Sequence, residues 1–99
     1  MEITVKKLIE ILNSDLSYKL IDVREPYEYE DGNIKNSINI PMDEVLGMIN
    51  DIENVDYIIF CCRTGRRSAA VNYMVRRQFK KTNTYNLRSG YENYKEYIK

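Results

Sequence analysis

The residues best suited to chemistry lie in one short segment, 62–68, which reads Cys-Arg-Thr-Gly-Arg-Arg-Ser. The chain has 2 cysteines and no histidine, so a nucleophilic thiol has no imidazole to activate it. The surroundings must stabilise the thiolate instead. Arg63, Arg66 and Arg67 supply positive charge, and Gly65 permits the backbone angles of a tight loop that turns N–H groups inward. These features predict that the pKa of Cys62 lies below that of a free thiol.

A plainer interpretation is that Cys62 is a small packed hydrophobe and that the arginines are solvated surface charges. The position of Cys62 after a strand, beside arginines and a glycine, favours the reactive interpretation. Cys61 ends the strand, and we expect it to face the core. A vicinal disulfide is disfavoured because its ring is strained and a reducing cytosol opposes it. Two thiols without histidine also make a poor zinc site, so no metal is expected.

The segments around this loop predict an α/β domain that spans residues 1–99. Residues 57–61 form the most β-like segment, and a helix is expected from Ser68 with Ala70, Val71, Met74 and Val75 facing inward. Further strands are expected at 2–4, 20–23, 38–40 and 84–87, and further helices at 5–12, 26–32, 42–50 and 91–98. This alternation predicts a doubly wound parallel sheet of about five strands with helices on both faces. Ligands bind beyond the carboxyl ends of such strands, where segment 62–68 lies.

Charge is unevenly distributed along a chain whose formal net charge is zero. Residues 22–44 hold seven acids and two bases, whereas residues 63–81 hold seven bases and no acid. The basic run predicts either a solvated helix face or a positive field over an anion site. With a pI near 6.3, the domain is not expected to bind nucleic acid. Tyr91, Tyr94 and Ile98 fall on one helical stripe, so we expect them to pack against the core rather than to stack on bases. With no apolar run of about 20 residues and no secretory signal, we expect a cytoplasmic protein without membrane contact.

Four motifs in order resemble the rhodanese family over nearly the whole chain. Residues 62–68 match its active-site loop, C-R-[ST]-G-x-R-[SA], at every fixed position, and residues 20–25 resemble its L-[IL]-D-V-R-E segment. Residues 32–34 and 37–41 resemble its G-H-I and A-x-N-I-P stretch, and residues 85–90 resemble its closing Y-x-L-x-G-G turn. Three positions depart from the pattern, where Asn33 replaces a histidine, Ser89 a glycine and Tyr94 a tryptophan. None of them lies in the loop.

The resemblance implies a sulfurtransferase in which Cys62 accepts a sulfane sulfur as a persulfide, without a cofactor. The donor would be a small anion such as thiosulfate, and the acceptor would be cyanide, a thiol or a protein partner. Substrate binding would fall to the other loop residues, with Ser68 and the strand-end pair of Asp22 and Arg24 in support. That pair serves equally well as a salt bridge bracing the strand end, and Glu28 is expected to be structural. The substrate-binding loop residues are Arg63, Thr64, Gly65, Arg66 and Arg67.

Three other functions fit parts of the pattern. A cysteine-dependent phosphatase needs five residues between its cysteine and arginine, but only four separate Cys62 from Arg67, and Ser68 occupies the phosphatase arginine position. A partner-docking domain without activity would not require the cysteine or the loop arginines. A sulfur carrier that serves a protein partner without turnover of small molecules remains open at the level of sequence.

Overall fold

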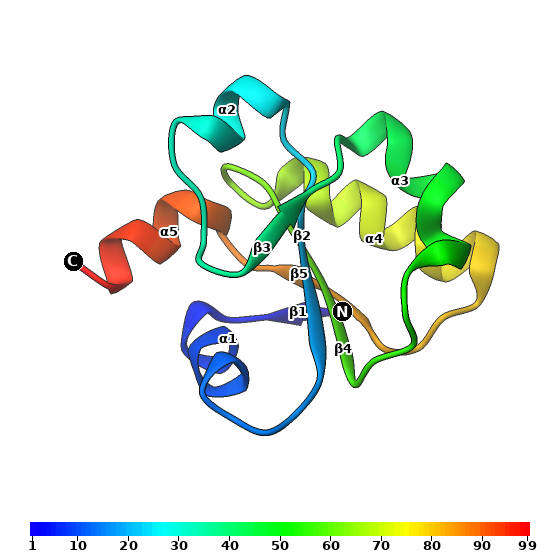
Figure 1. Ribbon diagram of the computed structural model, residues 1–99, viewed down its shortest axis with the longest axis horizontal. Helices are drawn as coiled ribbons and strands as arrows, with labels where there is room; N and C mark the ends of the chain where they lie inside the picture. The colour runs from blue at the N-terminus through cyan, green and yellow to red at the C-terminus, as the bar shows by residue number, and fades with distance from the viewer.

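The computed structural model describes Met1–Lys99 and contains a five-stranded sheet with helices on both faces (Figure 1). All strand pairs are parallel, and the strand order is β1-β5-β4-β2-β3. This arrangement confirms the predicted α/β fold. The strands are β1 (Glu2–Ile3), β2 (Tyr18–Asp22), β3 (Ser37–Asn39), β4 (Tyr57–Cys61) and β5 (Thr84–Leu87).

Strand β4 lies at the centre of the sheet, between β5 and β2, and its apolar side chains are buried on both faces. Ile58 and Phe60 belong to one hydrophobic core, whereas Ile59 and Cys61 belong to the other. This alternation follows from the two-residue period of an extended strand. Cys62 lies with Phe60, so the two adjacent thiols are on opposite faces. The expectation that Cys61 faces the core is confirmed, and both cysteines are free thiols.

Each face of the sheet is covered by two helices that supply the other half of a core. Helices α1 (Val5–Leu12) and α5 (Gly90–Tyr97) cover the face that contains Cys61. Helices α3 (Met42–Met48) and α4 (Arg66–Phe79), with the 3₁₀ turn η1 (Ile49–Asp51), cover the face that contains Cys62. The short helix α2 (Pro26–Glu30) follows β2 and lies at the top of the view in Figure 1. None of these helices has the length and apolar character needed to cross a bilayer.

Helix α4 differs from its prediction in its start and in its inward face. It begins at Arg66 rather than Ser68, because Gly65 adopts left-handed angles and serves as the N-cap. Val71 and Val75 are buried as predicted, but Ala70 and Met74 are exposed. The inward stripe instead includes Ser68 and Asn72, both buried polar residues. The hydrophobic pattern missed them because it does not count polar side chains as core.

The remaining boundaries move by one to three residues. Thr4 caps α1 as predicted, accepting a hydrogen bond from the N–H of Lys7 at 3.1 Å. The helix expected over 42–50 changes to a 3₁₀ turn at Ile49, and the final helix runs over Gly90–Tyr97 rather than 91–98. Ile98 therefore lies outside that helix and is 56% exposed, so its predicted packing is wrong. Strand β2 was predicted over 20–23 and β3 over 38–40, and each begins before its predicted start and ends one residue before its predicted end. Strand β1 was predicted over 2–4 and ends at Ile3.

Candidate active site

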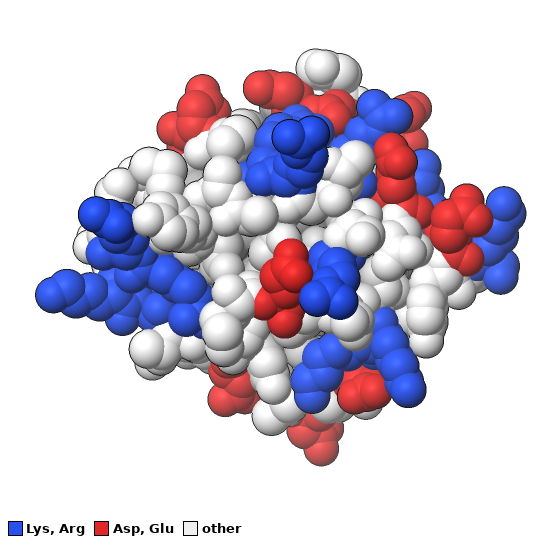
Figure 2. All heavy atoms as spheres, turned by 180° about the vertical axis from the view of Figure 1, so that it is seen from behind, with Lys and Arg blue, Asp and Glu red and all other residues white.

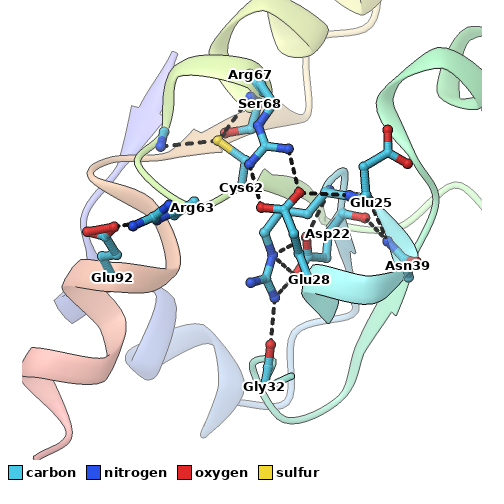
Figure 3. Close-up of polar contacts among 12 residues, drawn as sticks. Asp22, Glu25, Glu28, Gly32, Asn39, Cys62, Arg63, Arg67, Ser68 and Glu92 are labelled. Atoms are coloured by element: carbon cyan, nitrogen blue, oxygen red, sulfur yellow. Dashed lines mark hydrogen bonds and ion pairs between the residues drawn. The ribbon is translucent and has the colours of Figure 1, made fainter. Parts of the chain in front are cut away.

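The loop between β4 and α4 surrounds the sulfur atom of Cys62 with hydrogen-bond donors (Figure 3). The backbone N–H of Gly65 lies 3.2 Å from Cys62 Sγ, and the N–H of Ser68 lies 3.4 Å away. The hydroxyl of Ser68 approaches the same sulfur at 3.3 Å. Cys62 is only 1% exposed, so these donors replace water around it.

The loop can close this tightly because Gly65 has φ +95°, a left-handed conformation that strongly favours glycine. A Cβ at this position would also crowd the backbone N of Ser89 and the carbonyl O of Leu87. Its turn directs the N–H groups at the start of α4 toward Cys62 Sγ. The positive end of the helix dipole therefore points at the sulfur.

The beginning of α5 holds the other side of the loop. The N–H of Tyr91 donates to the carbonyl O of Cys62 at 2.8 Å, and the N–H of Glu92 donates to the carbonyl O of Arg63 at 3.0 Å. Gly90 permits this approach, since a Cβ there would collide with the backbone of Cys62 and Arg63. This clamp was not predicted, because backbone hydrogen bonds between distant segments leave no mark on residue types.

The pKa values of the two cysteines are shifted in opposite directions. Burial by itself would raise the pKa of Cys62, but hydrogen bonds from the Ser68 hydroxyl and from the N–H groups of Ser68, Gly65 and Thr64 outweigh it and lower the pKa. Burial raises the pKa of Cys61 well above its ordinary value, and the neighbouring charge of Asp22 adds to this effect. The surroundings therefore favour the thiolate form at Cys62 and disfavour it at Cys61.

The three loop arginines have different electrostatic surroundings. Arg67 forms a two-pronged ion pair with Glu28 of α2, at 2.8 and 2.9 Å. Arg63 pairs with Glu92 of α5 at 2.7 Å in an exposed position. Arg66 is exposed and makes no ion pair. Sequence reasoning missed both carboxylate partners, because neither is near the loop along the chain.

Asp22 and Arg24 form a buried ion pair at the end of β2, beside the loop. Their side chains are 0% and 5% exposed, and the guanidinium contacts both carboxylate oxygens at 2.8 to 3.0 Å. Arg24 also donates to the carbonyl O of Gly32 at 2.7 Å, and Asn39 donates to the carbonyl oxygens of both Asp22 and Arg24. These contacts favour the bracing interpretation of the pair, because its hydrogen bonds hold three segments together.

Most of the basic run lies away from the loop. The guanidinium of Arg76 donates hydrogen bonds to the carbonyl oxygens of Thr82 and Thr84, and Arg77 donates to the Tyr73 hydroxyl. Figure 2 shows basic atoms gathered at the left of the view, where the far end of α4 lies once Figure 1 is turned. The charges of the run are therefore spread along a 14-residue helix rather than gathered at the loop, which favours a solvated helix face for its far end.

The three residues that depart from the family pattern are accommodated by contacts or backbone angles at their own positions. Asn33 donates to the carbonyl O of Tyr29 at 2.9 Å and so fastens the end of α2. Ser89 takes a left-handed φ of +61°, a conformation that a glycine would occupy with less strain. Tyr94 stacks on Tyr91 with ring centroids 6.4 Å apart, and both rings pack against the core. This packing confirms the expected role of these two rings.

A polar groove of about 890 Å³ lies between α2 and α5 and reaches the loop at Arg63. Acidic and basic side chains both line it, and the guanidinium carbon of Arg24 lies 4.6 Å from the centre of the Tyr91 ring. The groove offers polar contacts of both signs next to the loop. Its walls comprise Arg24, Tyr27, Glu28, Asp31, Gly32, Arg63, Tyr91, Glu92, Lys95 and Glu96.

Comparison with known families assigns this arrangement to one class. The family model described as Rhodanese-like domain matches residues 4–97. The chain therefore belongs to the rhodanese-like family, as its motifs predicted. A rhodanese-related protein from Thermoplasma volcanium is 30% identical, has a TM-score of 0.84, and aligns over 97% of this chain and 91% of its own.

Curated relatives connect the family to sulfur. The chain is 37% identical over 81 residues to the putative sulfur carrier protein YrkF of Bacillus subtilis, covering 81% of this chain and 44% of that protein. It is 32% identical over 83 residues to the putative sulfurtransferase YtwF of the same organism, covering 83% of this chain and 81% of that protein. The chain thus spans less than half the length of YrkF.

The Glu28–Arg67 ion pair makes a pH-dependent contribution to stability. The hydrogen bonds and charge of Arg67 lower the pKa of Glu28 from 4.5 to about 2. Because the folded pKa is depressed, the stabilisation is complete above pH 4.5 and is lost as the pH falls toward 2. We expect Glu28→Gln to lower the free energy of unfolding by about 1–2 kcal/mol at pH 7, and by less at pH 3. Urea unfolding at both values measures this, and an equal loss at each pH would contradict it.

The acidity of Cys62 is measurable by alkylation. The rate of iodoacetamide reaction should rise with pH around a midpoint below about 8.5, the ordinary value of a free cysteine. The Cys61→Ser variant reports on Cys62 alone. A midpoint at or above the free value in that variant would show that the loop donors do not stabilise the thiolate.

Proposed function

We propose that the protein is a sulfurtransferase that carries sulfur as a persulfide on Cys62. The observation that carries the proposal is the set of donors on Cys62 Sγ, which comprises two N–H groups and one hydroxyl within 3.4 Å. A thiolate stabilised in this way needs no histidine, and the chain contains none. The names of the relatives YrkF and YtwF, a putative sulfur carrier and a putative sulfurtransferase, agree with this chemistry.

The reaction has two steps that return the enzyme to its starting state. The Cys62 thiolate attacks the outer sulfur of a donor such as thiosulfate, and the donor's S–S bond breaks with its electron pair leaving on sulfite. Cys62 then carries a persulfide whose charge resides on the terminal sulfur. An acceptor such as cyanide attacks that sulfur, the persulfide bond breaks, and its electron pair restores the thiolate as thiocyanate leaves.

The surroundings of the loop favour a small anionic donor. Cys62 is 1% exposed, which shields it from bulky reagents. Arg66 is the loop arginine without a carboxylate partner, so its charge remains available to a substrate. Arg67 is held by Glu28 and Arg63 by Glu92, and we assign them mainly to shaping the loop. Backbone groups of Thr64 and Gly65 would then bind the terminal sulfur of the persulfide.

A sulfur carrier that passes its persulfide to a protein partner is the second candidate. The specific support is the 37% identity to a putative sulfur carrier. Both candidates share the loading step and differ in the discharge step. A phosphatase is less well supported, because the loop has only four residues between Cys62 and Arg67.

Loading is tested by intact mass. Brief exposure to thiosulfate should add the mass of one sulfur atom, and peptide mapping should locate it on Cys62. Cyanide should then remove it as thiocyanate with repeated turnover. A protein that loads but discharges to cyanide only very slowly is a carrier.

Two matched variants control the loading experiment. Cys62→Ser should abolish both the adduct and turnover, whereas Cys61→Ser should retain them because Cys61 faces the opposite core. An inactive Cys61→Ser with an active Cys62→Ser would refute the assignment of the nucleophile. Hydrolysis of p-nitrophenyl phosphate that depends on Cys62 would favour the phosphatase instead.

Capture of the anion is tested through Arg66. We expect Arg66→Ala to raise the apparent KM for thiosulfate about 3- to 10-fold while changing kcat less than about 2-fold, because its charge acts before the chemical step. The wild-type rate at low substrate should fall as salt rises. Arg77→Ala is the matched control, since Arg77 is an exposed arginine of the same helix. Equal kinetics in Arg66→Ala and Arg77→Ala would exclude a role for Arg66.

A further inference from the structure

The hydroxyl of Ser68 faces two acceptors but has only one proton to donate. Its Oγ lies 3.3 Å from Cys62 Sγ and 2.5 Å from Oδ1 of Asn86. Ser68 is 0% exposed and Asn86 is 2% exposed, so neither side chain is freely solvated. A serine hydroxyl donates one hydrogen bond and accepts others. Cys62 and Asn86 therefore compete for the same proton.

The orientation of Asn86 makes this competition unavoidable. Its Nδ2 donates to Oε2 of Glu2 at 3.3 Å, and that carboxylate accepts hydrogen bonds only. Reversing the amide would place its oxygen against the Glu2 carboxylate and its N–H₂ against Ser68. Arg88 fixes the same carboxylate from the other side, at 3.2 Å. The Asn86 oxygen is thus held toward Ser68 as an acceptor.

We propose that Asn86 is a positioning residue that holds the Ser68 proton while Cys62 Sγ is uncharged and releases it when Sγ becomes a thiolate. The inference rests on the proposed sulfur transfer, in which Sγ alternates between these two states. In the persulfide the charge is on the terminal sulfur, so Sγ needs no donor and the hydroxyl bonds to Asn86. No covalent bond changes in this step, and only the hydroxyl hydrogen rotates.

The exchange matters most when the persulfide is discharged. The acceptor's electron pair forms a bond to the terminal sulfur, the persulfide bond breaks, and its electron pair moves to Cys62 Sγ. The Ser68 hydroxyl then rotates from Asn86 to the new thiolate and stabilises it as the leaving group. The Asn86 oxygen is left buried without a donor, which is costly. Asn86 therefore favours the uncharged states of Sγ over the thiolate.

The charged groups around Cys62 take no part in this exchange of the Ser68 proton. Arg67 faces it from α4, with Glu28 of α2 paired to that arginine. The Asp22–Arg24 pair lies at the end of β2, and Cys61 lies on the opposite face of β4. Only Ser68 and Asn86 share a single proton with the sulfur.

The test is the alkylation midpoint of Cys62 in a double-mutant cycle, measured in the Cys61→Ser background. Removing the competing acceptor in Asn86→Leu should lower the midpoint by about 0.5–1 pH unit. Ser68→Ala should raise it, because the thiolate loses a donor. In the combined Ser68→Ala and Asn86→Leu protein, the Asn86 substitution should have no further effect, because no proton remains to be shared.

Two further variants keep the experiment decisive. Asn72→Leu is the matched control, because Asn72 is also a buried asparagine, on the inner face of α4. Its side chain donates to the carbonyl O of Met1 and does not contact Ser68. The alkylation midpoint of Cys62 should not change in this variant. Asn86→Ala removes the same acceptor with a smaller side chain if Asn86→Leu does not fold. An unchanged or raised midpoint in the folded Asn86 variant, or an equal fall with and without the Ser68 hydroxyl, would overturn the proposal. Alkylation requires no sulfur donor, so this result is independent of whether the protein transfers sulfur.

Discussion

A sulfur atom that water hardly reaches can carry a negative charge only when hydrogen-bond donors replace its lost hydration. Cys62 satisfies this condition with backbone N–H groups and one hydroxyl, none of which carries a formal charge. The donors converge because Gly65 turns the chain into the start of α4. The rest of the site is arranged to keep that short loop closed.

Contacts from α5, α2 and the end of β2 hold the loop and its surroundings in place. The first turn of α5 donates to the carbonyl oxygens of Cys62 and Arg63, so one loop is bound through both its N–H and its C=O groups. Glu28 binds Arg67 from the opposite side. The buried Asp22–Arg24 pair fixes the end of the neighbouring strand. Breaking such a buried pair by removing one partner is costly, so the strand end beside the loop is firmly held.

Positive charge near the sulfur is smaller than the number of arginines suggests. Two of the three loop arginines are neutralised by carboxylates, and the other basic residues of α4 lie toward its far end. Hydrogen bonds from the Ser68 hydroxyl and from the N–H groups of the loop therefore stabilise the thiolate, and Arg66 is left as the loop arginine without a carboxylate partner. In the proposed sulfur transfer, this division separates the acidity of Cys62 from the binding of the donor.

Patterns in the sequence were enough to predict the order of strands and helices, the family, and the position of the loop that contains Cys62. Hydrophobic runs report burial directly, which is why Tyr57–Cys61 and Thr84–Leu87 were predicted to the residue, and the 62–68 motif is contiguous. The partners of the loop could not be predicted in this way. The contacts of Glu28 with Arg67 and of Asn86 with Ser68 join residues 39 and 18 positions apart. Such pairings depend on which strands are neighbours and which way each helix faces, and these are properties of the packed sheet that no local pattern of residue types records.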